Sequence, residues 1–389
     1  IIDGILGTGF KKKVREELIF IINWINKSNS IVLSIDVPSG LNTDSGIVDN
    51  LAVNADFTLT IENLKVGMVF REGKNQSGVV KIAKIGVPVE AKLLLGGLRW
   101  KMFNESLAFR LLRKPKVDIN KYNSGKVLII AGSKGMTGAS ILATHAALRA
   151  GAGMTISVVP SSLNNIFEKC ILEGITYALD DNLSGHLKIE HFDEIMDKVI
   201  WADSVLIGPG LGRNKSTLEL IKKLIFSIKK PLILDADGLF PFKNNYKKLN
   251  KRKFPLVITP HFGELSSILG IKLKKVESDF PEIMTNFMQN FNHTVLAKQV
   301  PSCTFNKGNV TINNSGNPGL AKAGSGDVLS GIISSFVAQG IAIEDSTKLA
   351  AYIHGKTSDI ISLKKGFRGQ NPSDLIDLIP KVIMNYEYA

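Results

Sequence analysis

A short loop near the C-terminus, Gly324-Ser325-Gly326-Asp327, has the residue types that phosphate chemistry requires. Glycines leave room for backbone N–H groups of the loop and of a following helix to converge on an anion, and the helix dipole favours negative charge there. A carboxylate beside that anion can accept the proton of a hydroxyl group that attacks a phosphate. Asp is also a preferred helix N-cap, so Asp327 taken alone could simply cap its helix.

Four more loops combine glycine with polar residues directly after apolar segments that read as strands. In open parallel α/β sheets, ligands bind outside the carboxyl ends of the strands. We therefore expect all the loops to line one rim, which favours a general-base role for Asp327 over a cap. The four are residues 132–138, 208–212, 235–238 and 259–264.

Single residues in these loops stay ambiguous. Residues 132–138 match neither the GxxxxGK[ST] nor the GxGxxG spacing, and close packing of helix on strand would explain some of their glycines. His261, a lone histidine after proline, is more often a hydrogen-bonded loop residue than a ligand. Asp235 and Asp237 can hold Mg²⁺ through water or can finish a turn, and both interpretations remain open.

The elements that position these loops form two α/β blocks. Alternating strands and helices predict parallel βαβ units in both. We expect a first domain over residues 1–100, a linker over 101–113 with an amphipathic helix at 105–112, and a second domain over 114–389. The predicted strands are 1–2, 31–35, 57–61, 79–85, 127–131, 156–159, 204–207, 232–235, 256–259 and 294–298, and the predicted helices are 14–26, 139–150, 328–338 and 346–362.

Composition excludes several classes of protein. The 389 residues are 44% apolar, which fits a globular protein of two domains, and no apolar run is long enough to span a membrane. There is no signal-peptide pattern, so we expect a cytoplasmic protein without a membrane partner. The net charge of +13 comes from dispersed lysines without interleaved aromatics. This argues against nucleic acid and favours solvated lysine faces, although the surplus positive charge would also attract an anionic nucleotide.

Two further expectations concern the cysteines and the first residue. Cys170 and Cys303 lie far apart and belong to no metal-binding cluster, so we expect both to be buried small side chains. The sequence begins at Ile1, without Met and within an apolar strand, so we expect upstream residues to be missing.

The set and order of the loops in the second block resemble the NAD(P)H-hydrate dehydratase family of the ribokinase-like superfamily. The resemblance implies removal of water from (6S)-NAD(P)H hydrate, driven by ADP or ATP, with release of AMP and phosphate in the ADP-dependent case. Hydroxide is a poor leaving group, whereas a phosphorylated hydroxyl leaves readily. The matching residues are 125–139, 208–212, 235–237, 259–261, Glu264, Lys298, 316–319 and 324–331.

The family pattern also implies roles for single residues. The hydrated dinucleotide would contact Ala139, Gly212, His261 and the catalytic Asp327. ADP, with Mg²⁺ as cofactor, would contact Lys298, Gln299, Val300, Pro301, Ser302 and Gly326. The sequence departs from the family where it has Asn120-Lys121 in place of His-Lys and Lys298-Gln299 in place of Lys-Gly. Gln299 adds a side chain where glycine would let the backbone approach the nucleotide.

The first block resembles the C-terminal half of the NAD(P)H-hydrate epimerase domain, a Rossmann-like fold, through residues 3–9, 35–42, Asp44, Gly46 and 65–67. The resemblance implies K⁺ on Asp3 and Ser39, whose oxygens suit an alkali cation, and proton transfer by Asp3 and Lys65. Any single one of these residues could instead serve only a turn or a helix cap. Because the family's upstream Asn-rich loop is absent, we expect this domain to be truncated and inactive. The implied substrate contacts are Gly7, Thr8, Gly9, Phe10, Lys11, Lys12, Lys13 and Asp36.

The sequence therefore predicts an α/β protein in which a truncated Rossmann-like epimerase domain precedes a ribokinase-like α/β/α dehydratase domain, with NAD(P)H hydrate and ADP as ligands and a homo-oligomeric state. One alternative is a ribokinase-like small-molecule kinase of the hydroxymethylpyrimidine or thiazole type. Another is a nucleotide-binding module without catalysis, which the departures at Asn120 and Gln299 allow.

Overall fold

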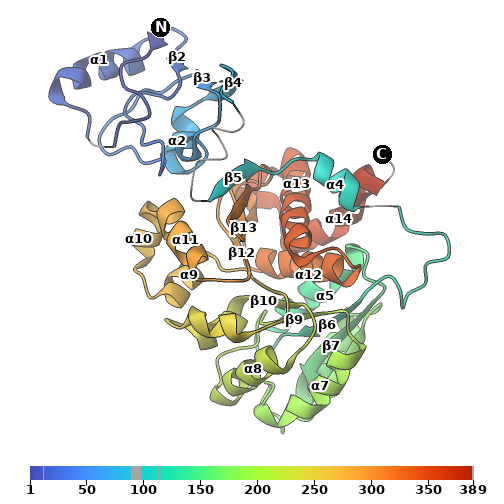
Figure 1. Ribbon diagram of the computed structural model, residues 1–389. Helices are drawn as coiled ribbons and strands as arrows, with labels where there is room; N and C mark the ends of the chain where they lie inside the picture. The colour runs from blue at the N-terminus through green and yellow to red at the C-terminus, as the bar shows by residue number, and fades with distance from the viewer. Residues whose placement is uncertain (12, 89–97, 113, 388–389) are drawn as a thin grey trace. The chain divides into compact units, whose positions relative to one another are not determined.

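The computed structural model describes residues 1–11, 13–88, 98–112 and 114–387 (Figure 1). The chain forms two compact units. Unit 1 comprises Ile1–Trp100 and Lys274–Phe287, and unit 2 comprises Lys101–Leu273 and Met288–Ala389. Within the described residues, no helix combines the length and the apolar character that crossing a membrane requires.

Unit 1 is built on a four-stranded parallel sheet in the order β1-β2-β3-β4. Helix α1 (Glu16–Lys27) packs Ile22 and Ile25 into a core with Val14, Val32 and Val53. The predicted parallel arrangement is confirmed, and the helix begins two residues after the predicted start. The other elements are β1 (Ile2–Asp3), β2 (Leu33–Ile35), β3 (Phe57–Ile61), β4 (Val79–Ala83), α2 (Arg71–Gln76), α10 (Leu273–Ser278) and α11 (Phe280–Gln289).

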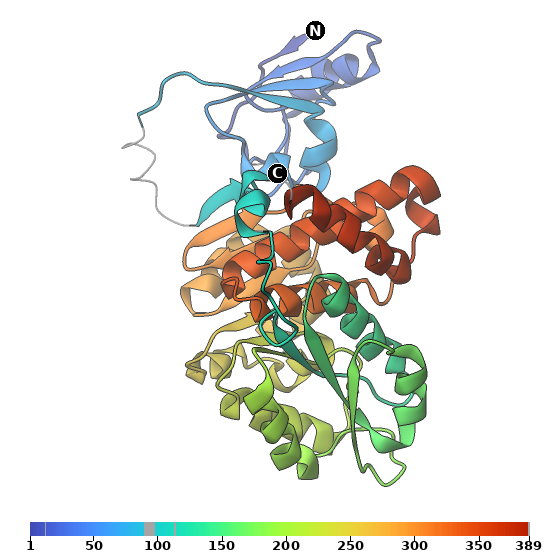
Figure 2. The same cartoon turned by 90° about the vertical axis from the view of Figure 1, so that its right-hand side faces the viewer.

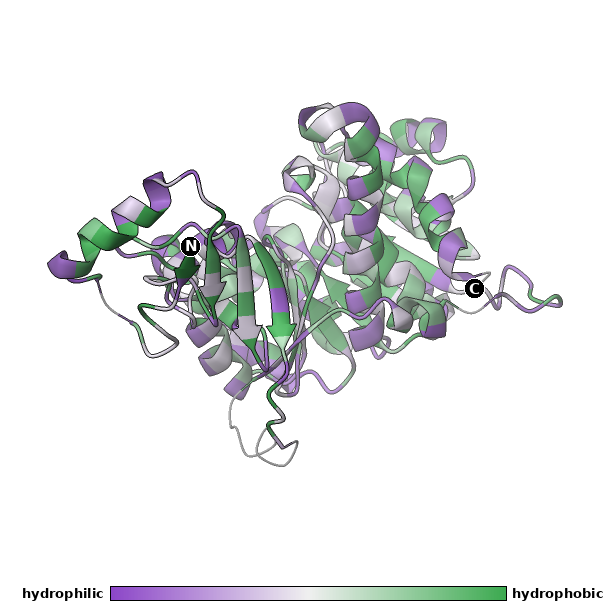
Figure 3. Ribbon diagram, turned by 90° about the horizontal axis from the view of Figure 1, so that it is seen from above, coloured by the Kyte–Doolittle hydropathy of each residue, from purple (hydrophilic) through white to green (hydrophobic). Residues whose placement is uncertain are grey.

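Unit 2 contains a ten-stranded sheet in the order β5-β14-β13-β12-β11-β10-β9-β6-β7-β8. The strands from β12 to β8 pair in parallel, as the sequence predicts. Most residues of these strands are buried, as expected of a sheet covered on both faces, and Figure 3 colours the ribbon by the hydropathy of each residue. The strands are β5 (Arg99–Met102), β6 (Lys126–Ile130), β7 (Met154–Pro160), β8 (Ile175–Leu179), β9 (Ser204–Ile207), β10 (Leu232–Leu234), β11 (Leu256–Ile258), β12 (Thr294–Ala297), β13 (Cys303–Asn306) and β14 (Asn309–Ile312).

The β13–β14 hairpin pairs antiparallel with β12, which the sequence reading did not anticipate. Its two-residue turn consists of Lys307 and Gly308, both with positive φ (43° and 79°). Such a turn matches the twist of a hairpin, and glycine adopts this conformation without strain. The hairpin continues the sheet directly after the predicted nucleotide segment at residues 298–302.

Helices cover both faces of this sheet (Figures 1 and 2). One face packs against α5 (Thr137–Arg149), α12 (Ser325–Ala338), α13 (Ile343–Gly369) and α14 (Pro372–Glu387), whose apolar residues join Val127, Ile129, Leu206, Ile233 and Val257 in one core. Helix α12 therefore lies directly against the strands whose loops we expected to form the rim. The remaining helices are α4 (Ser106–Leu111), α6 (Asn164–Cys170), α7 (Phe192–Trp201), α8 (Lys215–Ser227) and α9 (Phe262–Leu269).

The segment we expected to be a linker, residues 101–113, is part of unit 2 as far as it is described. Phe103, Ala108 and Leu112 are buried in the unit 2 core. The hydroxyl groups of Tyr352 and Tyr386 both donate to Glu105 Oε1 at 2.8 Å. These contacts attach the segment to α13 and α14.

The two cysteines differ from each other. Cys303 is buried, as expected, but Cys170 at the end of α6 is exposed, so the expectation for Cys170 was wrong. Helix α6 buries Phe167 rather than its last turn, which leaves the Cys170 side chain outside the core.

Candidate active site

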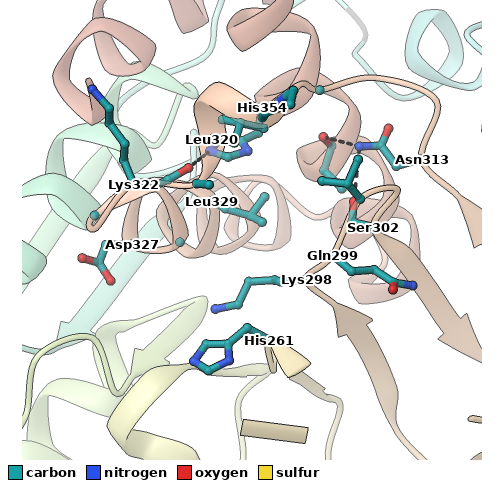
Figure 4. Close-up of a pocket in the computed structure, with 18 of the residues that line it drawn as sticks. His261, Lys298, Gln299, Ser302, Asn313, Leu320, Lys322, Asp327, Leu329 and His354 are labelled. Atoms are coloured by element: carbon teal, nitrogen blue, oxygen red, sulfur yellow. Dashed lines mark hydrogen bonds between the residues drawn. The ribbon is translucent and has the colours of Figure 1, made fainter. Parts of the chain in front are cut away.

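A pocket of about 650 Å³ lies between the carboxyl ends of β10, β11 and β12 and the first turn of α12 (Figure 4). Three of the expected rim loops contribute to its wall, together with residues 298–302. Of the predicted ligand contacts, those that line this pocket are His261, Lys298, Gln299, Val300, Pro301, Ser302, Gly326 and Asp327.

Ala139 and Gly212 are outside the lining of this pocket, but their loops are bonded into the same rim. Ser133 Oγ donates to Gly210 O at 2.8 Å, and a Cβ atom added to Gly210 would lie 2.8 Å from the Ala139 side chain. Gly212 N donates to Asp237 Oδ2 at 3.0 Å. The loops after β6, β9 and β10 therefore form a continuous edge beside the pocket.

Lys298 is the central cation of the pocket. Its Nζ donates to Asp235 Oδ1 at 2.6 Å and lies 4.0 Å from Glu264 Oε2. Thr259 Oγ1 also donates to Asp235 Oδ1, at 2.6 Å. Burial alone would lower the pKa of Lys298, but the charges of Asp235 and Glu264 raise it above its usual value. Lys298 therefore stays protonated and can donate to phosphate oxygens.

Asp327 lies in the first turn of α12, but it is not the cap. Gly324 occupies the N-cap position with φ of 91°, and the helix has no side-chain cap hydrogen bond. The capping interpretation is therefore wrong. Burial is the main cause that raises the pKa of Asp327 to about 7, and the charge of Asp235 adds to it, while Lys298 opposes the rise. A carboxyl group with this pKa is suited to exchange a proton near neutral pH.

Gly326 brings the backbone of the Asp327 loop close to Lys298. A Cβ atom at Gly326 would lie 3.3 Å from Lys298 Nζ. Figure 4 shows the Asp327 carboxylate and the Lys298 ammonium on the same side of the pocket. An anion at the start of α12 would thus meet the helix amides, the lysine and the carboxylate together.

His261 has a structural role as well as a place in the pocket wall. It caps α9, because its Nδ1 accepts from Gly263 N at 2.9 Å while its own N donates to Glu264 Oε2 at 2.9 Å. The side chain remains 58% exposed. Nδ1 acts as an acceptor in this cap, so Nε2 carries a proton, and Nε2 lies 3.5 Å from Glu264 Oε1.

The two aspartates of the loop after β10 are both engaged. Asp235 holds Lys298 and Thr259, and Asp237 accepts from Gly212 N and from Arg213 Nε, each at 3.0 Å. Among the described residues, no group of three or more His, Cys, Asp or Glu side chains is arranged to hold a metal ion. Asp235 and Asp237 thus join neighbouring loops of the rim.

Asn313 and His354 are two of the pocket residues that the sequence did not predict. Asn313 is buried and donates from N to Ser302 O at 2.8 Å and from Nδ2 to Ala351 O at 3.0 Å. His354 is buried with Nε2 3.3 Å from Ser325 Oγ, and burial lowers its pKa to about 4, so its ring is neutral. Asn313 fastens the predicted nucleotide segment to α13, and His354 fastens the Asp327 loop to the same helix.

Unit 1 gathers its predicted residues at the carboxyl ends of β1, β2 and β3. Asp3 is buried, and its carboxylate accepts from Ser34 Oγ at 2.7 Å, from Ser39 N at 2.9 Å and from Ser39 Oγ at 2.6 Å. Asp36 adopts a φ of 67° and pairs with Lys65, whose Nζ also donates to Ile61 O at 2.9 Å. Asp3 with Ser39, and Asp36 with Lys65, therefore form two polar pairs.

The glycine loop of unit 1 leaves space for a ligand. Cβ atoms added to Gly7 and Gly9 would meet nothing within 4 Å. Phe10 N donates to Gly7 O at 3.1 Å, and Thr43 Oγ1 donates to Thr8 O at 3.2 Å. Lys11 forms an exposed ion pair with Asp44 at 2.8 Å. Lys13 is exposed, and Lys12 lies outside the described residues.

Comparison with known proteins gives matches along both units. Residues 127–381 match the family model described as NAD(P)H-hydrate dehydratase, and residues 1–67 match the model of the YjeF-related protein N-terminus. A protein of Moorella thermoacetica named bifunctional NAD(P)H-hydrate repair enzyme is 33% identical over 388 residues, which cover 100% of this chain and 73% of that protein. The Escherichia coli protein of the same name is 28% identical, covering 98% of this chain and 71% of its own length.

Solved structures support the fold of unit 2. The Bacillus subtilis ADP/ATP-dependent NAD(P)H-hydrate dehydratase co-crystallised with ATP/Mg²⁺ is similar with a TM-score of 0.63 at 22% identity, covering 75% of this chain and 99% of that one. A ribokinase-like superfamily protein of Enterococcus faecalis has a TM-score of 0.62 at 23% identity, covering 76% and 98%. The expected ribokinase-like fold is confirmed.

Proposed function

Because the chain belongs to the family of bifunctional NAD(P)H-hydrate repair enzymes, we propose that its unit 2 pocket uses ADP to dehydrate (6S)-NAD(P)H hydrate with Asp327 as general base. Repair of hydrated nicotinamide cofactors is the function of this protein, with a dehydratase and an epimerase domain in one chain. The observation that carries the proposal is the meeting of Asp327, with its raised pKa, and Lys298 at the start of α12.

The proposed reaction begins with proton transfer. Asp327 takes the proton of the hydroxyl group on the hydrated nicotinamide ring, and the oxygen attacks the terminal phosphate of ADP, so that an O–P bond forms and AMP leaves. Lys298 and the amides of the first turn of α12 stabilise the charge on the transferred phosphate. The C–O bond then breaks, so that phosphate leaves with the former hydroxyl oxygen, and the neighbouring ring carbon loses its proton to solvent. The products are NAD(P)H, AMP and phosphate.

We expect Mg²⁺ to bind at this site only together with the nucleotide. The described residues offer no cage of three ligands, and Asp235 is already paired with Lys298. Mg²⁺ keeps several waters and binds through one or two carboxylates plus substrate phosphates. We expect Asp235 to face the hydrated ion, which would neutralise phosphate charge when bound, while Asp327 remains the base.

The same reasoning applies to K⁺ in unit 1. Asp3 and Ser39 offer carboxylate and hydroxyl oxygens, the donor type that an alkali cation prefers. Both side chains are bonded to each other, and Ser39 Oγ also accepts from Leu6 N at 2.8 Å. We propose that these oxygens would hold the ion, while Asp36, Lys65 and the open loop around Gly7 and Gly9 would contact the substrate.

The first test of the dehydratase assignment is direct. The protein is incubated with NADH hydrate, ADP and Mg²⁺, and the return of the NADH absorbance band is followed. We expect recovery that requires ADP. A stable phosphorylated product without recovery of NADH would instead identify the chain as a small-molecule kinase, and nucleotide binding without turnover would identify a module that has lost catalysis.

Replacing Asn313 with alanine is expected to weaken nucleotide binding more than it slows turnover. The change removes the side-chain bonds that hold Ser302 and Ala351 together, at 3.3 and 3.0 Å. We expect the KM for ADP to rise about tenfold while kcat changes less than about threefold, because a loss of one or two buried hydrogen bonds amounts to roughly 1–2 kcal/mol. Steady-state kinetics with varied ADP measure both quantities.

Asn314→Ala is the matched control, since Asn314 is the next residue and is exposed. Its kinetics should equal those of the wild type. An unchanged KM for ADP in the Asn313 variant would show that residues 298–302 do not bind the nucleotide.

A further inference from the structure

Arg213 is an exposed arginine that is nevertheless held in place. It directly follows Gly212 in the loop between β9 and α8. Its Nε donates to Asp237 Oδ1 at 3.0 Å, and its guanidinium carbon lies 4.6 Å from the centre of the Phe240 ring. The side chain is still 63% exposed. Arginine side chains have much rotamer freedom to lose, so an ion pair and a ring contact together orient this guanidinium before any ligand arrives.

The orientation leaves the other end of the guanidinium available. Nε is the atom that pairs with Asp237, so the N–H groups of the two Nη atoms remain for another acceptor. Within the described part of the chain, Asp237 is the one acceptor that Arg213 has. A planar pair of N–H donors matches two oxygens of a phosphate group in a bidentate bond.

Arg213 is connected to the catalytic residue of the proposed reaction through its partner Asp237. Asp237 lies close enough to Asp327 for its charge to contribute to the raised pKa of that carboxyl group, and Gly212 N donates to the same Asp237. Arg213 follows β9, whereas residues 298–302 follow β12, three strands further along the sheet. A phosphate near Arg213 would therefore belong to the dinucleotide and not to ADP.

We propose that Arg213 binds a phosphate group of the hydrated dinucleotide and sets the affinity of the dehydratase site for that substrate. The inference rests on the proposed function, because it assumes a dinucleotide at the rim. Two phosphates have the required chemistry. The pyrophosphate is common to NADH hydrate and NADPH hydrate, and the 2′-phosphate occurs only in the NADPH form.

The test compares Arg213→Ala and Arg213→Lys with the wild type on both hydrates. We expect the alanine variant to raise the KM for the hydrate by about tenfold or more, as the loss of a charge-assisted bond to phosphate implies, with an unchanged KM for ADP. The KM of the lysine variant for the hydrate should lie between those of the wild type and the alanine variant. Lysine keeps the positive charge but loses the planar pair of N–H donors. A higher KM for both hydrates would identify the pyrophosphate as the group that Arg213 binds. A higher KM for NADPH hydrate alone would identify the 2′-phosphate.

Lys222→Ala is the control, because it removes one positive charge from the exposed surface of α8, away from the rim. Its KM values should match those of the wild type. Unchanged KM values for both hydrates in Arg213→Ala, or a rise in the KM for ADP instead, would overturn the proposal. Wild-type dehydration tests the proposed function separately. Should that fail, equilibrium dialysis with NADPH hydrate still compares binding by the wild type and the Arg213 variants.

Discussion

Replacing Asp327 with asparagine is expected to lower kcat for dehydration of NADH hydrate by roughly a thousandfold, within the range for removal of a general base. Asparagine has nearly the same shape but cannot accept the proton. The amides of α12 and the Lys298 ammonium remain, so the dissociation constant for ADP should change less than about threefold. Rapid absorbance kinetics measure the first quantity and calorimetric titration with ADP the second. A variant that restores NADH at the wild-type rate would show that another group takes the proton.

The pH dependence of the wild type follows from the same residue. Burial, with the charge of Asp235, raises the pKa of Asp327 to about 7, and the base is active only when deprotonated. The value of kcat/KM should therefore be low in acid, rise with pH through about 7 and level off above it. The residual activity of Asp327→Asn should lack this rise. A flat wild-type profile from mildly acidic to mildly basic pH would contradict the assignment.

Replacing Lys298 with methionine is expected to damage both stability and nucleotide binding. Asp235 is only 1% exposed and would keep a buried charge without its partner. Removing one member of such a pair lowers the free energy of unfolding by about 3 kcal/mol. Because Lys298 opposes the rise in the pKa of Asp327, its removal should also move the pH profile to higher pH. Urea unfolding, ADP titration and a pH profile measure the three effects.

The double variant Asp235→Asn with Lys298→Met separates these effects. It removes both charges, so much of the lost free energy of unfolding should return, while ADP binding should stay weak because no cation faces the phosphates. Wild-type affinity for ADP in either variant would mean that Lys298 has no contact with the nucleotide.

The sequence located the rim because one geometric rule governs it. Carboxyl ends of neighbouring parallel strands meet at one edge of the sheet, so glycine-rich loops after β6, β9, β10 and β11 had to lie near one another. The same rule placed Asp3 and Asp36 at the carboxyl ends of the adjacent strands β1 and β2 in unit 1, where they form separate pairs with Ser39 and with Lys65. The sequence alone did not decide whether Asp327 is a general base or a helix cap. The backbone of α12 decides it, because Gly324 occupies the N-cap position.

Other features depend on partners that are distant in the chain. Asn313 gains its role from Ser302 and from Ala351, which lies 38 residues away, and His354 meets Ser325 across 29 residues. No local pattern predicts such pairs. The β13–β14 hairpin and the capping box of His261 with Glu264 did leave local signals, a Lys-Gly turn and a glutamate three residues after the cap.

The ratio of phosphate released to NADH restored tests the central claim most directly. The proposed reaction links phosphate release to NADH formation, because the hydroxyl oxygen of the hydrate must attack ADP before it can leave the ring as part of phosphate. With purified NADH hydrate, ADP and Mg²⁺, we expect one phosphate for each NADH and no phosphate when the hydrate is omitted. Phosphate release without hydrate, or NADH restored without phosphate, would contradict the account.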